Sequence, residues 1–306
     1  MEHGPPRSPN KLPQACSLKS QASPVPESIE QFSEEVRRGE RFAFGENWRG
    51  FLATVDDARI AAAKRAFCEM LECSSLAGKS FLDAGSGSGL FSLVARRLGA
   101  RVHSFDYDPT AVECTMELRR RFSPDEKPWT IERGSVLDEL YLRTLGQFDV
   151  VHSWGVLHHT GDMHTAMNLI APLVKPDGGK LFIAIYNDQG RRSRIWRAVK
   201  KAYCRLPRPL KPLVLLPAAA WLWTPSLILD CVNLQPFHSW RNYSRERGMS
   251  PWHDIIDWVG GLPFEVAKPE EIFEFYRQRG FTLCKLVTVG GRLGNNQFVF
   301  QRGPVT

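Results

Sequence analysis

The chain has 306 residues and 43% hydrophobic content, which is enough for one large domain or two small ones with a sizeable core. A charged content of 24% is ordinary for a folded protein and excludes extensive disorder away from the chain ends. The net charge of +7 is a mild basic bias, which suits an anionic substrate or a nucleic acid without requiring either.

Cysteine usage and the N-terminal sequence indicate the compartment. The seven cysteines include no C-x-x-C pair, which argues against a disulfide framework and against a cysteine-rich zinc site. The first residues also lack the apolar run of a secretory signal. We therefore expect a cytoplasmic protein with reduced thiols.

The chain before residue 79 is predicted to hold a tail and helices. Residues 1–26 are rich in Pro, Ser, Gln and Lys and are predicted to be a disordered tail. Apolar residues at helical spacing predict a short helix within 27–39, and an aromatic segment follows at 42–48. The alanine-rich stretch 56–71, which begins with two aspartates as candidate N-caps, is predicted to be a longer helix.

From residue 79, short apolar runs alternate with helical patterns. The predicted strands are 80–84, 101–105, 129–133, 148–153 and 180–185, and the predicted helices between them are 90–98, 109–121 and 163–174. This alternation is typical of βαβ units, in which helices cover both faces of a parallel sheet. The sequence therefore predicts an α/β fold of the Rossmann-like kind.

The alternation stops at residue 191 and resumes at residue 269. A helix is predicted at 269–279, and two strands at 281–288 and 297–301 are close enough in sequence to form a hairpin. We therefore expect a core made of residues 27–190 and 269–306. The intervening segment 191–268 is predicted to be an inserted helical lid that contacts the substrate.

A glycine-rich turn, Asp83-Ala84-Gly85-Ser86-Gly87-Ser88-Gly89, lies between the first predicted strand and its helix. Glycines allow a sharp turn and close approach of a ligand, and the helix N-terminus offers free N–H groups. Asp106 ends the second strand, where an acid can accept both hydroxyls of a ribose. A nicotinamide fingerprint would need glycine at position 90, where this chain has Leu90, so the loop better fits an amino acid and a sulfonium.

Residues 79–188 resemble the class I S-adenosylmethionine-dependent methyltransferases, especially the small-molecule O-methyltransferase branch that includes quinol methyltransferases. The motifs that carry the resemblance are FLDAGSGSG at 81–89, GSVLD at 134–138, FDVVHSWGVLHH at 148–159 and LVKPDGGKL at 173–181. The resemblance implies S-adenosylmethionine as the cofactor and a seven-stranded, mostly parallel sheet. The cofactor-binding residues that the loop and the resemblance indicate are Asp83, Gly85, Gly87, Gly89, Asp106, Tyr107, Ser135, Val136, Ser153 and Trp154.

Acceptor-binding residues are expected beyond the carboxyl ends of the fourth and fifth strands, because open α/β sheets bind ligands there. A hydroxyl acceptor must lose a proton, and histidine is the usual base. His158 and His159 are therefore the candidate catalytic residues. The candidate substrate-binding residues, taken from these strand ends and from the insertion, are Tyr186, Asn187, His238, Trp240, Arg241, Tyr243, Arg245, Arg247, Trp252 and His253.

The arginines at 241, 245 and 247 favour an anionic acceptor, because guanidinium groups match carboxylate geometry. The sequence therefore predicts a small carboxylic acid as the substrate, which would need no base. A quinol, phenol or sugar hydroxyl remains the alternative. No cluster of ligand residues has convincing metal-binding spacing, so no metal is expected.

The sequence leaves two further partners open, RNA and a membrane surface. An RNA-binding protein with this fold is one alternative, but Ser153-Trp154-Gly155-Val156 stands where enzymes that methylate nitrogen in RNA often have N/D-P-P-Y. The basic stretch 191–201 suits RNA or an anionic membrane as well as a solvated helix face. The apolar run 210–234 contains three prolines and an aspartate, so we expect peripheral membrane contact at most and no membrane span.

Overall fold

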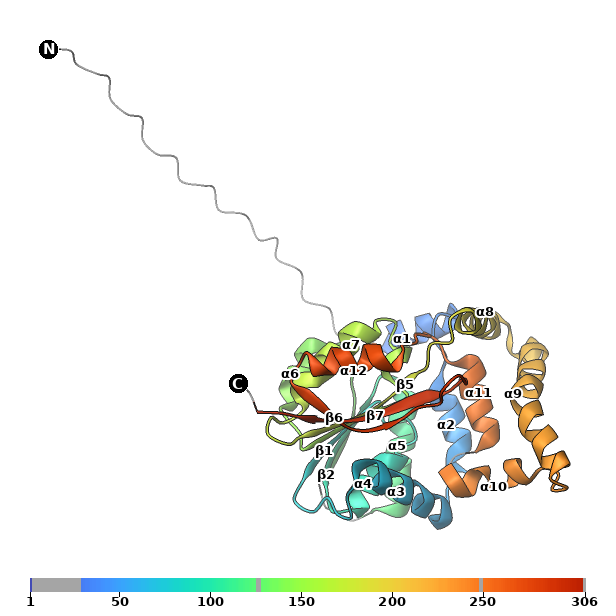
Figure 1. The fold of residues 1–306 in the computed structure, drawn as a ribbon, viewed down its shortest axis with the longest axis horizontal. Coiled ribbons are helices and arrows are strands. Elements are labelled where there is room, and N and C mark those ends of the chain that lie inside the picture. The colour runs from blue at the N-terminus through green and yellow to red at the C-terminus, as the bar shows by residue number, and fades with distance from the viewer. Residues whose placement is uncertain (2–28, 125–127, 248–249, 305–306) are drawn as a thin grey trace.

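The computed structural model describes Met1 and residues 29–124, 128–247 and 250–304, apart from the side chains of 244–247. Beyond Met1, the tail expected at 1–26 lies outside these residues. Figure 1 shows a central sheet with helices on both faces and a group of helices beside it.

A seven-stranded sheet forms the centre of the fold (Figure 1). In spatial order its strands are β3 (Trp129–Arg133), β2 (Arg101–Asp106), β1 (Ser80–Ala84), β4 (Val150–Trp154), β5 (Lys180–Tyr186), β7 (Asn295–Arg302) and β6 (Phe281–Val287). Strands β1 to β5 pair in parallel, and β7 is antiparallel to both β5 and β6. The predicted Rossmann-like class and the C-terminal hairpin are thus confirmed. The strand order reverses between β1 and β4, the place where such sheets open a crevice at their carboxyl ends.

Alternate residues of each strand pack on opposite faces of the sheet. Phe81 faces the helices α3 (Asp57–Leu71), α4 (Leu90–Arg97) and α5 (Pro109–Phe122), with which it shares one hydrophobic cluster. Its neighbour Leu82 belongs to the other cluster, which includes residues of α6 (Glu139–Leu145), α7 (Met163–Ile170) and α12 (Pro269–Arg277). Two buried faces explain why β5, in the interior of the sheet, is a nearly continuous apolar run.

Aspartates start four of these helices by accepting a hydrogen bond from an early backbone N–H group. The caps are Asp56 for α3, Asp108 for α5, Asp138 for α6 and Asp162 for α7, with N···O distances of 2.8 to 3.1 Å. Asp108 also accepts from the backbone N–H of Gly45 at 2.7 Å. This second bond fixes the helix α2 (Phe44–Leu52) against the start of α5.

Two helices of the core were not predicted. The aromatic segment at 42–48 runs into α2, whose residues Phe44, Trp48, Phe51 and Leu52 have helical spacing. The other helix, α6, has seven residues, too few for a periodic pattern to be recognised. The N-terminal helix α1 (Ile29–Arg37) lies within the range expected for it.

The described residues of the insertion at 191–268 form four α-helices that lie on one side of the sheet (Figure 1). They are α8 (Arg191–Arg205), α9 (Pro212–Val232), α10 (His238–Arg247) and α11 (Pro251–Gly260). Their buried side chains form a third hydrophobic cluster with Phe42 and Tyr186 of the core. The cluster ties the insertion to the carboxyl end of β5.

The apolar run forms a continuous helix despite its prolines. Pro217 and Pro225 lie inside α9, which continues through both. Each proline deprives one carbonyl, that of Leu213 or Trp221, of its helical N–H partner. Both of these residues have exposed side chains, so the affected turns lie on the outer side of the helix. Among the described residues, 208–232 form one helix long and apolar enough to cross a bilayer, judged by length and composition alone.

Candidate active site

A cavity of about 820 Å³ opens at the carboxyl ends of the parallel strands. Its volume lies within the range of roughly 300–1,000 Å³ that is usual for small-molecule sites. The core contributes the glycine-rich turn and the ends of β2, β4 and β5, and the insertion contributes side chains of α9, α10 and α11. The cavity is therefore closed by the segment predicted from the sequence to contact substrate.

The glycines of the turn are required by backbone geometry and by close neighbours. Gly85 has φ of +90°, and a Cβ atom on it would lie 2.4 Å from Val156. Gly87 has φ of +56°, and its N–H donates to Asp106 Oδ2 at 2.9 Å. The turn thus presents bare backbone to the cavity, which is what close approach of a ligand needs.

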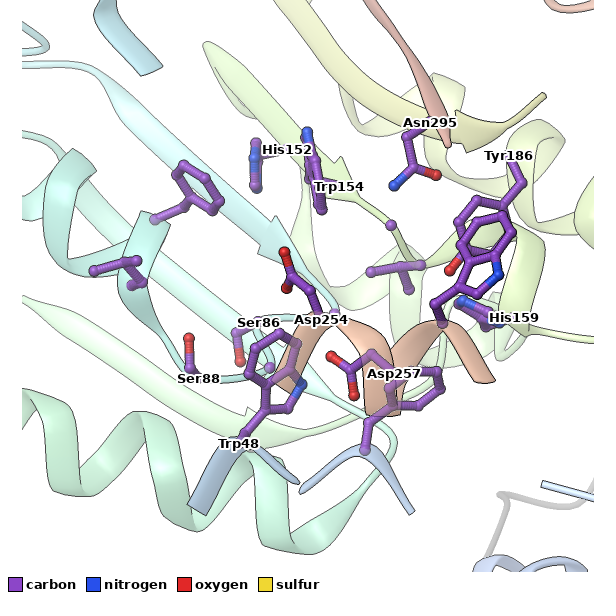
Figure 2. A pocket seen from close by; sticks show the side chains of 18 of the residues that line it. Trp48, Ser86, Ser88, His152, Trp154, His159, Tyr186, Asp254, Asp257 and Asn295 are labelled. Atoms are coloured by element: carbon purple, nitrogen blue, oxygen red, sulfur yellow. The ribbon is translucent and has the colours of Figure 1, made fainter. Parts of the chain in front are cut away.

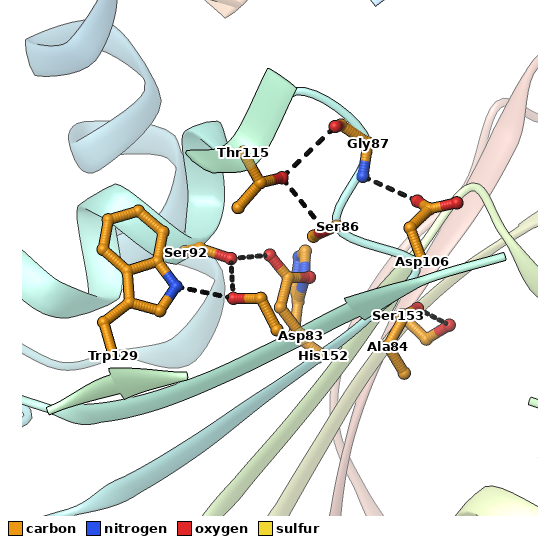
Figure 3. A network of polar contacts seen from close by, with 11 residues as sticks. Asp83, Ala84, Ser86, Gly87, Ser92, Asp106, Thr115, Trp129, His152 and Ser153 are labelled. Carbon is orange, nitrogen blue, oxygen red and sulfur yellow. Dashed lines mark hydrogen bonds and ion pairs between the residues drawn. The ribbon is translucent and has the colours of Figure 1, made fainter. Parts of the chain in front are cut away.

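A buried polar network holds the start of this turn in place (Figure 3). Asp83 Oδ1 pairs with His152 Nδ1 at 2.8 Å, and its other oxygen accepts from the Ser92 hydroxyl. Ser92 also bonds Ser104 at 2.8 Å, and the indole N–H of Trp129 donates to Ser104 at 2.8 Å. Asp83 and His152 are each 2% exposed. The network links the four strands β1 to β4 and α4 at the base of the cavity. His152 was not among the residues predicted from the sequence.

Asp106 stands at the end of β2, in the cavity wall, with both carboxylate oxygens occupied by backbone donors. Oδ2 accepts from Gly87, and Oδ1 accepts from the Asp108 N–H at 2.9 Å. Burial, followed by the nearby Asp108, raises the pKa of Asp106 to about 7. A ligand that donates hydroxyl hydrogens to this carboxylate would stabilise its charged form.

Tyr107 extends the wall beyond Asp106. The Arg41 and Arg133 guanidinium groups lie 4.7 and 5.2 Å from its ring centroid, and Phe32 of α1 contacts it edge-on. Figure 2 shows other parts of the cavity wall. Of the ten residues predicted to bind cofactor, eight line the cavity: Asp83, Gly85, Gly87, Asp106, Tyr107, Ser135, Val136 and Trp154.

The other two predicted cofactor residues lie outside the cavity lining. Gly89 is the N-cap of α4, and a Cβ atom there would come within 2.9 Å of Thr115. Ser153 is fully buried, and its hydroxyl donates to the Ala84 carbonyl at 2.9 Å. Both residues support the glycine-rich turn from the side away from the cavity.

The two candidate catalytic histidines have different positions. His159 lines the cavity, whereas His158 is fully buried behind it, with its ring 4.0 Å from that of Tyr186. His159 Nδ1 lies 2.7 Å from the Pro263 carbonyl, which can only accept a hydrogen bond. Nδ1 therefore carries the hydrogen, and Nε2 keeps its lone pair. Burial and then Lys200 lower the pKa of His159 to about 3, so the ring is neutral at physiological pH.

Some of the predicted substrate-binding residues line the cavity and others lie outside it. Tyr186, His238 and Tyr243 line the cavity. Outside the lining are Asn187, Trp240, Arg241, Trp252 and His253, whereas the side chains of Arg245 and Arg247 lie outside the described part of the structure.

The contacts of these outlying residues are structural. The Asn187 amide donates to the Gly290 carbonyl at 2.8 Å, and Trp240 packs on Trp223 with ring centroids 4.6 Å apart. The His253 carbonyl accepts from Asn47. Arg241 is exposed, because α10 turns residues 238, 239, 242 and 243 toward the cavity and 241 away from it. The arginine that the sequence placed at the substrate is therefore at the surface.

Two aspartates that the sequence analysis did not select reach the cavity from α11. Asp254 and Asp257 are three residues apart, which places them on one helix face, and Figure 2 shows both on the same turn of ribbon. Asp257 Oδ1 accepts from Asn47 Nδ2 at 2.7 Å, and Asp254 accepts from the Tyr243 hydroxyl at 2.5 Å. Burial and then Asp254 raise the pKa of Asp257 well above its usual value. The spacing of Asp254 and Asp257, three residues apart on one helix, is the feature of the sequence from which this pair could have been predicted.

Aromatic side chains surround the aspartates and His159. Those in the cavity wall are Phe42, Phe44, Trp48, Trp154, Tyr186 and Trp258. Lys200 lies fully buried behind Trp258 and donates to its backbone carbonyl, and burial lowers the pKa of this lysine to about 7. No group of metal-ligating side chains was found among the described residues. This end of the cavity is thus apolar, with a few carboxylate and imidazole groups.

Comparison with known proteins identifies the family. A methyltransferase domain family model matches residues 57–253. The chain belongs to the class I S-adenosylmethionine-dependent methyltransferases. It is 32% identical to the ubiquinone biosynthesis O-methyltransferase of Xanthomonas euvesicatoria pv. vesicatoria (strain 85-10) over 178 residues, 56% of this chain and 71% of that protein. The ubiquinone biosynthesis O-methyltransferase of Xanthomonas axonopodis pv. citri (strain 306) is 31% identical over 177 residues, 55% of this chain and 71% of that protein. The methyltransferase is thus of the small-molecule O-methyltransferase kind.

Solved structures show more distant likeness. A magnesium protoporphyrin IX methyltransferase from Synechocystis PCC 6803 is 14% identical, with a TM-score of 0.49 over 88% of this chain and 99% of that one. An O-methyltransferase family protein from Burkholderia thailandensis is 17% identical, with a TM-score of 0.49 over 90% of this chain and 68% of that one. Similarity at this level says nothing about the acceptor of the present enzyme.

The glycine-rich turn and Asp106 fit the family's cofactor. The turn leaves space that a side chain would fill, and Asp106 offers a half-buried carboxylate to ribose hydroxyls. Bound S-adenosylmethionine supplies an electrophilic methyl carbon on a sulfonium. The residues that would hold it are Asp83, Gly85, Gly87, Asp106 and Tyr107. The aromatic end of the cavity would then remain for the acceptor.

Proposed function

We propose that this methyltransferase acts on a hydroxyl group of a bulky, largely apolar small molecule such as a phenol or quinol. The observation that carries the proposal is the acceptor end of the cavity, where Asp254, Asp257 and His159 meet aromatic walls. Flat apolar rings favour a ring-containing acceptor. Carboxylate and imidazole groups can accept a hydroxyl hydrogen, whereas an acidic acceptor would be repelled by the aspartates.

Asp257 is the proposed base and His159 the proposed positioning group. Burial gives Asp257 a higher proton affinity than an ordinary carboxylate has, and Asn47 holds one of its oxygens. His159 presents the Nε2 lone pair, because its Nδ1–H is held by Pro263. The acceptor oxygen bonds to the methyl carbon while its proton passes to Asp257 and the carbon–sulfur bond breaks, releasing S-adenosylhomocysteine. Alignment of nucleophile and methyl group supplies much of the rate in such a displacement.

The carboxylic acid predicted from the sequence has weaker support. Arg241 is exposed and outside the cavity. Arg41 does line it, but this guanidinium already pairs with Glu35 and donates to the His159 carbonyl at 3.1 Å. The similar Xanthomonas proteins are named for ubiquinone biosynthesis, which agrees with a hydroxyl on a ring.

The insertion and the cellular location complete the proposal. Residues 191–268 act as a lid, since α9, α10 and α11 supply one wall of the cavity. We place the enzyme in the cytoplasm, where thiols such as those of Cys68 and Cys114, which are free in the structure, stay reduced.

Release of S-adenosylhomocysteine with panels of phenols, quinols and small carboxylic acids tests the acceptor class. We expect turnover with ring hydroxyls. Asp257→Asn should lower kcat about a hundredfold or more, which is typical of a lost general base. The acidic limb of the kcat–pH profile should disappear in this variant, while cofactor affinity stays unchanged. His159→Gln should raise KM more than it lowers kcat.

Arg241→Ala and His253→Gln are the matched controls, because both residues lie outside the cavity. Both variants should keep wild-type kcat/KM. A fully active Asp257→Asn variant combined with loss of activity in Arg241→Ala would overturn the hydroxyl proposal in favour of the carboxylic acid.

A further inference from the structure

The outer surface of α9 is apolar to an unusual degree. Trp221 is 72% exposed, Leu213 70% and Ile228 57%. Of the eighteen exposed large apolar side chains among the described residues, nine fall between Leu210 and Phe237. Exposed apolar surface concentrated in this way marks a contact with another apolar phase or molecule.

The composition of α9 leads to the same conclusion. Its one charged residue is Asp230, which lies near the C-terminus and accepts from both the backbone N–H and the hydroxyl of Ser239. A helix that is apolar all round is normally covered all round. The inner side of α9 is covered, since Leu215 and Ala218 are buried in the third hydrophobic cluster. The outer side is the part left uncovered by the described chain.

A strongly basic surface adjoins this apolar one. Residues 191–229 contain nine lysines and arginines and no aspartate or glutamate. Of these nine, the exposed residues are Arg191, Arg192, Arg194, Arg197, Lys201, Arg205 and Arg208. They come from α8 and the connection to α9, and Figure 1 shows α8 beside the end of α9 at one outer edge of the molecule. An apolar strip flanked by cations complements the acyl chains and headgroups of an anionic lipid leaflet.

We propose that the exposed side of α9, with the basic residues of α8, docks the enzyme on the surface of an anionic membrane. The helix lies in the interface and does not cross the bilayer. Pro217 and Pro225 have no N–H to donate to the carbonyls of Leu213 and Trp221, and water in the headgroup region can satisfy such carbonyls whereas the hydrocarbon centre cannot. The contacts of α9 with α8, α10 and α11 also keep its inner side on the protein.

A second copy of the chain is a poorer occupant of this surface. In a twofold dimer the same patch faces itself, so the basic residues of one copy would lie near those of the other. No acidic residue within 191–229 is available to offset that repulsion. Anionic lipids offset it directly.

Docking would place the cavity next to the lipid. Leu222, Trp223 and Ser226 line the cavity from the inner side of the helix whose outer side touches the leaflet. An apolar acceptor dissolved in the bilayer would then enter past α9. This consequence rests on the proposed function, whereas the docking itself does not.

Co-sedimentation of the full chain with lipid vesicles tests the docking without any methyl transfer. The probes are vesicles of phosphatidylcholine with and without phosphatidylglycerol. We expect binding to the anionic vesicles that weakens at high salt. Trp221→Gln with Ile228→Gln should lower the partition coefficient about tenfold, because two apolar groups leave the acyl region. Arg191→Glu with Arg194→Glu should lower it at least about tenfold, since each basic residue near such a surface contributes about fivefold.

Matched variants separate docking from general surface effects. Met116→Gln with Leu140→Gln changes exposed apolar residues of α5 and α6, and Lys64→Glu with Arg65→Glu changes exposed charges of α3. Both controls should bind vesicles like the wild type, and all variants should bind S-adenosylmethionine normally in calorimetry.

Three results would overturn the docking proposal. One is a wild-type chain that fails to bind anionic vesicles at low salt. Another is a dimer in sedimentation velocity that the α9 variants dissociate, which would assign the surface to a second copy. The third is binding of α9 variants and controls with equal strength. Failure of the proposed function would instead appear in the acceptor panel and leave vesicle binding intact.

Discussion

Asp106 is the residue proposed to bind the ribose of the cofactor. Two backbone N–H groups hold its carboxylate at the cavity wall, while burial raises its pKa to about 7. The charged form of Asp106 is therefore unfavourable in the folded apoprotein, and ribose hydroxyls bound to it would stabilise that charge. Recognition of the cofactor and the pH dependence of stability are linked through this residue.

Asp106→Ala should weaken S-adenosylmethionine binding at least about tenfold, since a hydrogen bond to a charged group contributes about 1.5–3 kcal/mol. Isothermal calorimetry measures the change, with Asp56→Ala as the control because Asp56 caps α3 away from the cavity. Equal affinity in a folded Asp106→Ala variant would remove this residue from the cofactor site.

The stability of the apoprotein should depend on pH through the same group. Its folded pKa of about 7 exceeds the ordinary 3.8, so its contribution is fully present below about pH 4 and lost as pH rises through 7. Asp106→Asn should therefore gain stability relative to wild type between about pH 5 and about pH 8, by up to roughly 4 kcal/mol. Denaturant unfolding of wild type and variant at the two ends of this pH range measures the difference in stability. An identical pH slope in both proteins would contradict it.

At the scale of elements, the glycine-rich turn joins β1 to α4 while Val156, from the segment after β4, packs on it. Positive φ at Gly85 is a local requirement, whereas the contact with Val156 is a tertiary one. Gly78 has φ of +76°, and a Cβ atom on it would meet nothing within 4 Å. Gly78 therefore has the backbone requirement for positive φ without a tertiary contact.

Comparison of Gly85→Ala with Gly78→Ala separates the two effects. Both variants should lose about 1 kcal/mol of unfolding free energy from backbone strain. Gly85→Ala should lose a further 1–3 kcal/mol or so by overpacking, together with cofactor affinity. Urea denaturation and calorimetry measure both quantities. Equal losses of unfolding free energy in the two variants would show that Val156 moves away from the added methyl group at position 85 without destabilising the fold.

At the scale of the whole molecule, two parts of the chain close one cavity: the α/β core and the four-helix insertion. Carboxylates of the core line the end of the cavity proposed for the cofactor, and those of α11 line the end proposed for the acceptor. The described residues contain no cluster suited to a metal ion. Displacement at a methyl carbon can proceed by positioning and proton removal alone.

Methyl transfer should therefore survive chelation. We expect the same rate of S-adenosylhomocysteine release before and after dialysis against EDTA, and no stimulation by added Mg²⁺ or Zn²⁺. Loss of turnover in EDTA that Mg²⁺ restores would contradict this expectation and point to a metal that substrate helps to bind.

The sequence by itself determined the fold of the core and the glycine-rich turn proposed to hold the cofactor. The alternation of strands and helices, the glycine-rich turn and the position of Asp106 depend on residues close in sequence, where spacing alone fixes geometry. Strand β1 and strand β3 match the predicted bounds. The C-terminal hairpin followed from its short connection.

Only the tertiary structure decided the acceptor end. In α10 and α11 polar residues are mixed with aromatic ones. Which side of each helix faces the cavity depends on how α10 packs on α3 and α9 and how α11 packs on α2 and α9. That packing turns Arg241 to solvent and brings Asp254 and Asp257 inward. It likewise lets α9 continue through Pro217 and Pro225, because the buried contacts of its inner side outweigh the lost hydrogen bonds.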